Sequence, residues 1–155
     1  MSALTQDRNT ECSGGDLLEI PVAASEVIYS GSLVCSNGLG YAVPASDTAG
    51  LKFEGVATAR ADNSAGEGGD VGVVVRRRGR HRFACKTALD QSALGAEVYA
   101  ADDQTVAADA ADVTNDIVVG VIDRVQSSDE CWISIDAVVL AGKTWTEPTT
   151  TTTAT

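Results

Sequence analysis

Residue types that most enzymes depend on are scarce in this 155-residue chain. It has one histidine, two phenylalanines and two tryptophans, and its four cysteines include no C-x-x-C pair. The single histidine, His81, lies among arginines, and neighbouring positive charge lowers imidazole basicity. A Ser-His-Asp or Cys-His site is therefore not expected. The dispersed cysteines do not match the ligand spacing of zinc sites, and no stretch has the carboxylate spacing of a calcium-binding loop, so we expect no metal, no cofactor and no enzyme activity.

Long apolar runs are also missing. No run approaches the roughly 18 residues that cross a bilayer, and the N-terminal stretch Met1–Cys12 is polar. A signal peptide would need an apolar segment there. We therefore expect neither a membrane partner nor export by a signal peptide.

Two glycine-containing stretches resemble phosphate loops but lack a required residue. Gly142-Lys143-Thr144 matches the end of a Walker A motif, but Ala137 occupies the position of its first glycine. In the stretch beginning at Gly66, a dinucleotide-binding motif would need glycine where Val71 stands. Neither stretch indicates a nucleotide site.

Small residues dominate the apolar fraction that the chain does have. Alanine supplies 23 and valine 18 of its residues. Because each alanine buries little area, such a core is thin per residue. A protein of this kind often gains stability by associating with copies of itself or with a partner.

Charge is distributed very unevenly around a net value of −11. Residues 71–86 carry six basic and no acidic side chains, whereas residues 87–140 carry eleven acids and one arginine. The bulk charge disfavours nucleic acid and anionic membranes as partners.

Short Val- and Ile-rich runs separated by turn residues predict an all-β protein with little helix. Asn37-Gly38 predicts a hairpin, and residues 126–130 predict a second one. Residues 97–107 read as strand, turn and strand. Residues 87–95 are the best helix candidate, with Thr87 as N-cap, Asp90 at the third position and Gly95 as C-cap.

We therefore expect a small single-domain β-barrel or β-sandwich with extended N- and C-terminal arms. The β-rich domain spans residues 16–140. Residues 1–15 form a flexible polar arm, and residues 141–155 form a tail with eight threonines. Such a tail buries too little surface to fold alone.

The arginine-rich stretch is the most unusual feature. Val71–Cys85 reads as one long strand, and side chains alternate along a strand. One face would then carry Arg76, Arg78, Arg80 and Arg82. These like charges need compensation, either from acids of residues 87–140 in the same molecule or from an acidic partner surface. Phosphate binding is a third interpretation.

The cysteines are interpreted as reduced, buried thiols that act as small apolar groups. Cys12, Cys35, Cys85 and Cys131 lie far apart in sequence. Sequence gives no distances between them, so oxidation of a pair remains open.

The order of several short motifs resembles a family of small tailed-bacteriophage proteins that decorate, or cement, the capsid. The motifs are Gly31-Ser32-Leu33-Val34, Gly40-Tyr41-Ala42-Val43-Pro44, Glu54-Gly55-Val56-Ala57, Ala61-Asp62-Asn63, Val73-Val74-Val75-Arg76-Arg77, Leu94-Gly95, Val98-Tyr99, Ala101-Asp102-Asp103-Gln104-Thr105-Val106, Val119-Gly120-Val121 and Trp132-Ile133-Ser134-Ile135-Asp136. They run from about residue 15 to residue 137. The arginine run through Arg82 and the threonine-rich tail have no counterpart in the resemblance.

The resemblance implies a compact β-rich, non-catalytic protein on the outer surface of a phage head, made in the host cytoplasm. It implies the major capsid protein as partner and a homo-oligomer, most often a trimer. Our interface hypothesis comprises Arg76, Arg78, Arg80, Arg82, Leu4, Thr5 and Trp145. The alternative function is a polyanion- or nucleic-acid-binding β-barrel module that uses the arginine-rich strand.

Overall fold

The computed structural model describes residue 6 and residues 8–136, and these form an all-β protein with two short 3₁₀ turns. The elements are β1 (Leu17–Pro21), β2 (Val27–Ile28), β3 (Leu33–Ser36), β4 (Ala42–Pro44), β5 (Lys52–Ala57), β6 (Ala61–Asp62), β7 (Gly72–Arg76), β8 (Arg80–Cys85), η1 (Gln91–Ala93), β9 (Glu97–Ala100), β10 (Thr105–Ala107), η2 (Ala110–Asp112), β11 (Val118–Val125) and β12 (Glu130–Ser134). The predicted all-β class is confirmed.

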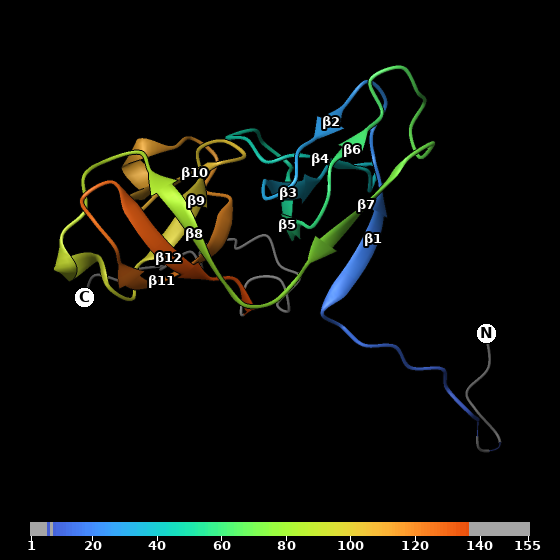
Figure 1. The fold of residues 1–155 in the computed structure, drawn as a ribbon, viewed down its shortest axis with the longest axis horizontal. Coiled ribbons are helices and arrows are strands. Elements are labelled where there is room, and N and C mark those ends of the chain that lie inside the picture. Colours follow the sequence, from blue (N-terminus) through green and yellow to red (C-terminus); the bar gives the residue numbers. More distant parts are fainter. Residues whose placement is uncertain (1–5, 7, 137–155) are drawn as a thin grey trace, which may run out of the picture.

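The strands form two neighbouring halves (Figure 1). The first half, here called the sheet half, has a five-stranded sheet in the order β1-β7-β5-β3-β4 and a small β2–β6 ribbon. The second half is a closed barrel in the order β10-β8-β12-β11-β9. The sequence predicted a barrel or a sandwich, and the structure combines a barrel with an open sheet.

The prediction of one strand over Val71–Cys85 is wrong. β7 ends at Arg76 in the sheet, and β8 begins at Arg80 in the barrel. Gly79 in the connection has a φ of +101°, a conformation that glycine adopts readily and other residues rarely do. The two strands also have different partners, since β7 pairs with β1 and β5 while β8 pairs with β12 and β10.

The predicted alternation nevertheless survives on both strands. Val73, Val75 and Phe83 are buried, whereas the side chains of Arg76 and Arg82 are exposed. The predicted alternation of buried and exposed side chains is therefore correct, although the chain passes from one sheet to the other.

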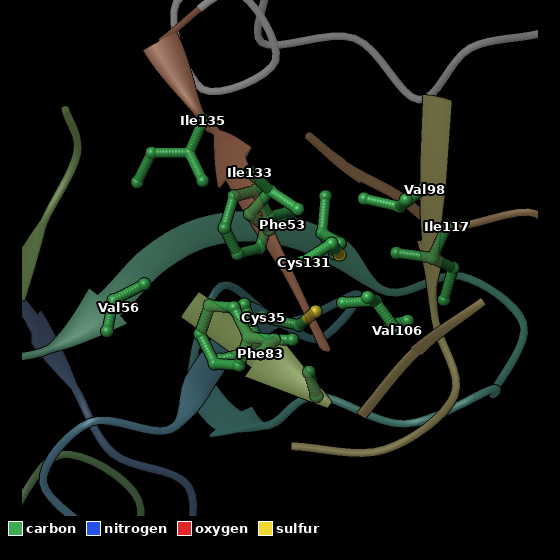
Figure 2. Packing of buried hydrophobic residues seen from close by; sticks show 14 of the residues in the cluster. Cys35, Phe53, Val56, Phe83, Val98, Val106, Ile117, Cys131, Ile133 and Ile135 are labelled. Atoms are coloured by element: carbon green, nitrogen blue, oxygen red, sulfur yellow. The ribbon is translucent and has the colours of Figure 1, made fainter. Parts of the chain in front are cut away.

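One hydrophobic cluster joins the sheet half to the barrel (Figure 2). Phe53 and Leu33 come from the sheet, and Phe83, Val98 and Ile133 come from the barrel. A second cluster lies on the opposite face of the sheet, under the β2–β6 ribbon. Its members are Ile20, Val22, Ile28, Val34, Ala42, Ala57, Ala61, Val73 and Val75. Because the sheet is packed on both faces, every residue of β3 is buried.

The predicted hairpin at Asn37 connects β3 and β4, but its loop is longer than the sequence indicated. The Asn37 side-chain oxygen accepts hydrogen bonds from the backbone N–H groups of Leu39 and Tyr41. These bonds hold Leu39 and Tyr41 in the loop, and β4 begins at Ala42. The predicted pairs β9–β10 and β11–β12 are confirmed.

The helix predicted over residues 87–95 is only the 3₁₀ turn η1, and its N-cap is Asp90. The Asp90 carboxylate accepts from the Ser92 backbone N–H, so it caps the turn itself. The Thr87 hydroxyl instead donates to the Asp112 carboxylate at the end of η2. Among the described residues, no helix has the length and apolar character needed to cross a membrane.

Candidate interaction surface

Two arginines of the basic run are paired with acids of the barrel. The Arg80 guanidinium contacts the carboxylate of Asp123 on β11 at 2.5 Å, and the Arg82 guanidinium lies 3.9 Å from the Glu130 carboxylate on β12. Both acids belong to the acidic stretch 87–140. The compensation expected within the molecule is thus present for these two charges.

Two further arginines, Arg77 and Arg78, meet acids that lie outside the acidic stretch 87–140. The Arg78 side chain lies 3.4 Å from the Asp16 carboxylate, and Arg77 lies 3.8 Å from the Glu54 carboxylate. These acids come from the N-terminal half of the chain. Proximity between β1, β5 and the β7–β8 connection creates these pairs, and sequence spacing contains no sign of it.

Hydrogen bonds also tie the β7–β8 connection to two other segments. One is Asp16, where the N-terminal arm joins β1, and the other is the last described residues. The Arg77 backbone N–H donates to the Asp16 carbonyl at 2.9 Å. The Gly79 N–H donates to the Asp136 carboxylate at 2.7 Å, and its carbonyl accepts from Ile135 at 3.2 Å. The N-terminal arm and the end of β12 therefore approach the same connection (Figure 1).

Arg76 differs from the other members of the run. Its side chain is exposed, and among the described residues it has no ion pair. Its backbone lies opposite Leu17 on β1 and Val56 on β5, so the three side chains project from one face of the sheet. Val56 packs into the cluster shared with the barrel, which identifies this face as the barrel side.

The barrel does not cover the far end of that face. Leu17 is 51% exposed, and Glu19, two residues further along β1, is exposed as well. Val74, opposite Glu19, is only partly buried. We call Leu17, Glu19, Val74 and Arg76 the open face. Neighbouring Leu18 is also exposed, although its side chain projects from the opposite face of β1.

Within residues 8–136, β1 pairs with β7 alone and is therefore an edge strand. Residues 8–15 continue from it without secondary structure, are exposed throughout and lead away from the body of the protein (Figure 1). An unpaired strand edge is a common site for contact with another chain. The adjacent leucines Leu17 and Leu18 were a usable sequence signal for this exposed edge, whereas the predicted interface lay on the arginines and the arms.

The two halves are also joined by the Asp47 carboxylate. It accepts from the backbone N–H groups of Thr114 and Asn115 at 2.7 and 2.8 Å and from the Asn115 side chain at 3.1 Å. Burial alone would raise the pKa of Asp47, but these hydrogen bonds and the Lys86 charge lower it below its ordinary value. This contact sits between the loop before β5 and the loop before β11.

The exposed ring of Tyr29 lies on the sheet half. The Arg60 guanidinium is 5.3 Å from the centre of the Tyr29 ring and pairs with Asp62 at 2.9 Å. The Asp62 pKa is lowered by its hydrogen bonds with the Ser64 hydroxyl and backbone and by Arg60. Arg60 is therefore already engaged by its own molecule.

The remaining predicted interface residues, Leu4, Thr5 and Trp145, lie outside the described residues. Within residues 6 and 8–136 no group of three metal-ligating side chains is assembled. The structure places Arg76 on β7 of the sheet, Arg78 in the β7–β8 connection and Arg80 and Arg82 on β8 of the barrel, so the four predicted arginines do not share the face of one strand.

Comparisons with protein-family models, curated proteins and solved structures give no match to this chain.

Proposed function

We propose that this protein is a structural, homo-oligomeric decoration protein that binds the outer surface of a phage head and stabilises the shell. The observation that carries the proposal is the open face on β1 and β7, which continues directly into the exposed arm of residues 8–15. One surface for association and one extended segment for contact are what a clamp between subunits requires.

A second copy of this chain is the proposed occupant of the open face. Glu19 and Arg76 project from the same side of neighbouring strands and carry opposite charges. A partner copy offers the complementary pair, with Leu17 and Val74 supplying apolar area between the charges. Covering this face would extend the thin Ala/Val core by burial between subunits.

The N-terminal arm is the proposed contact with the major capsid protein. Asp16, at its base, is held by the Arg77 N–H and the Arg78 side chain. The arm therefore leaves the body from a fixed point, and its polar residues order on the capsid at an entropic cost. Repetition over many copies multiplies the stabilisation of the shell.

The ion pairs weaken the alternative of a polyanion-binding module. Arg77, Arg78, Arg80 and Arg82 all meet carboxylates of the same molecule. Phosphate binding by these side chains would have to displace those partners. A fluorescence titration with duplex DNA at several salt concentrations checks the alternative, because real multi-phosphate binding weakens steeply with salt.

The capsid proposal is tested on particles. Heads that lack the protein should lose resistance to heat and to osmotic shock, and adding the purified full-length protein should restore it. A chain without residues 1–15 should occupy fewer sites on such heads. Unchanged resistance of undecorated heads contradicts cementing, and full occupancy by the shortened chain contradicts the role of the arm.

The subunit contact is tested separately by the mass of the protein in solution. Leu17→Asp places a charge in the open face and should shift the assembly toward the 15.9 kDa monomer. Leu39→Asp is the matched control, since Leu39 is 83% exposed on the β3–β4 loop. Equal behaviour of the two variants would remove the open face as the contact.

A further inference from the structure

Two cysteines of the barrel lie side by side on adjacent strands. The Sγ atoms of Cys85 on β8 and Cys131 on β12 are 3.2 Å apart, and both residues are free thiols. Cys131 is paired with Phe83, and Cys85 lies two residues further along the same strand. Both side chains therefore project from the same face of the β8–β12 pair.

We infer that Cys85 and Cys131 are a site of oxidative modification, at which a disulfide forms when a small-molecule disulfide reaches the barrel. A disulfide has an S–S distance of about 2.05 Å, so the sulfur atoms have to approach by roughly 1 Å. The strand pairing already holds the two backbones, because the Cys85 N–H donates to the Asp129 carbonyl at 2.8 Å. Rotation of the Cys85 side chain at the end of β8 supplies the remaining movement.

The different burial of the two thiols sets the order of the reaction. Cys85 is partly exposed, whereas Cys131 is fully buried. With glutathione disulfide as oxidant, the Cys85 thiolate attacks one glutathione sulfur and releases the first glutathione thiolate. The Cys131 thiol then loses its proton, and its thiolate attacks Cys85 Sγ and releases the second glutathione thiolate. Two protein thiols are oxidised, and one glutathione disulfide is reduced to two glutathione molecules.

The surroundings make this reaction slow at neutral pH and faster in mild base. Burial raises the pKa of Cys85, and the Asp129 and Glu130 carboxylates raise it further, against the lowering effect of the Cys131 contact. Burial and the neighbouring Cys85 also raise the pKa of Cys131. Since only thiolates attack disulfides, the oxidation is best followed at alkaline pH.

The other two cysteines provide internal comparisons. Cys35 is buried, and burial followed by the Glu54 carboxylate raises its pKa to about 12, so it should stay reduced. Cys12 is exposed on the N-terminal arm and should react with any oxidant present. A bond between Cys85 and Cys131 instead closes a loop of residues 86–130, which contains β9, β10 and β11. Closing this loop restricts the unfolded chain and so stabilises the barrel, whether or not the proposed capsid role holds.

The experiment uses the full-length protein, purified under reducing conditions and exposed to glutathione disulfide at about pH 8.5, above neutral pH so that more thiolate is present. Acid quenching, alkylation and trypsin follow. The expected product is residues 83–86 joined to residues 125–143, with Cys35 alkylated and Cys12 carrying glutathione. In a Cys12→Ser chain, the intact mass should fall by about 2 Da, the mass of the two hydrogens lost. The oxidised chain should unfold at a higher denaturant concentration, and dithiothreitol should abolish that shift.

Cys85→Ser and Cys131→Ala should each abolish the joined peptide and the shift in unfolding midpoint, whereas Cys12→Ser should preserve both. Cys85 is partly exposed, so its variant remains informative if the core variant at Cys131 fails to fold. The inference is overturned if both peptides stay alkylated after Cys12 is fully glutathionylated. A reaction that stops at glutathione on Cys85, or a link to the peptide of residues 9–52, overturns it as well.

Discussion

The barrel and the sheet half differ in whether they have an unpaired strand edge. The barrel closes on itself, and two of its arginines are paired with its own Asp123 and Glu130. The sheet ends in the edge strand β1, and beside it Arg76 and Leu17 face solvent. Closure removes the backbone groups that another chain could pair with, whereas an open edge keeps them available. Under the proposed function, the barrel provides structural support and the open edge of the sheet provides the surface for association.

Removing a large side chain from the shared cluster should destabilise both halves together, because the two halves have one core in common. Phe53 comes from the sheet and packs in the cluster that includes Phe83 and Ile133 of the barrel (Figure 2). Phe53→Ala should lower the free energy of unfolding by about 3–5 kcal/mol. Circular dichroism and Trp132 fluorescence, recorded in a Trp145→Phe background, should shift to the same new midpoint.

Leu39→Ala at an exposed loop position is the control and should change little. If the Trp132 signal kept its midpoint while the circular dichroism signal shifted, the barrel would be an independent folding unit. That result would contradict a shared core.

Gly55→Ala should destabilise the sheet half through a steric clash between neighbouring strands. Gly55 has a φ of +147°, and a Cβ atom there would lie 2.4 Å from the Arg76 carbonyl oxygen. The added methyl group therefore pushes β5 away from β7, at a cost of about 2–4 kcal/mol. Denaturant unfolding measures the loss, and hydrogen exchange should show the largest increase in β7 and β1. Gly38→Ala, at an exposed position with nothing within 4 Å of the added atom, should be close to neutral.

The strands themselves could be predicted well from the sequence. Alternation on either side of Gly79 correctly separated Val73, Val75 and Phe83 from the exposed arginines. Turn chemistry located the Asn37 loop and the hairpin before Glu130. These features depend on residues close in sequence, which is the range over which periodicity and turn preference act.

The pairing of distant segments could not be predicted in the same way. The period-two pattern continues across Gly79 and does not show which strands pair on either side of it, so β7 and β8 read as one element. The ion pairs of Arg77 with Glu54 and of Arg78 with Asp16 likewise depend on how distant segments pack together. The open face was missed for this reason, since it exists only where the barrel stops covering the sheet.

Acid should loosen the contact between the two halves at Asp47. Its pKa is lowered in the folded protein, so its carboxylate stabilises the fold above the unfolded pKa of about 3.9. That contribution is lost as the pH falls through this value toward the lower folded pKa. Asp47→Ala should cost about 1–2 kcal/mol at pH 7 through its lost hydrogen bonds and should flatten the stability curve below about pH 4. An Asp47→Ala curve with the same shape as that of the unmodified protein below about pH 4 would contradict the assignment to Asp47.

The smallest expected change in stability comes from substituting single arginines. These substitutions compare Arg80, which has an ion pair on the barrel, with Arg76 on the open face. Arg80 is exposed and paired with Asp123, so Arg80→Ala should lower stability by about 0–1 kcal/mol, and high salt should reduce this difference. Arg76 has no ion pair among the described residues, so Arg76→Ala should leave the denaturation midpoint of the monomer unchanged. On the open face, however, Arg76→Ala removes the charge proposed to meet Glu19 of a second copy, and it should weaken self-association measured by sedimentation. Association that weakens equally in both variants would mean that overall charge, and not the open face, drives assembly.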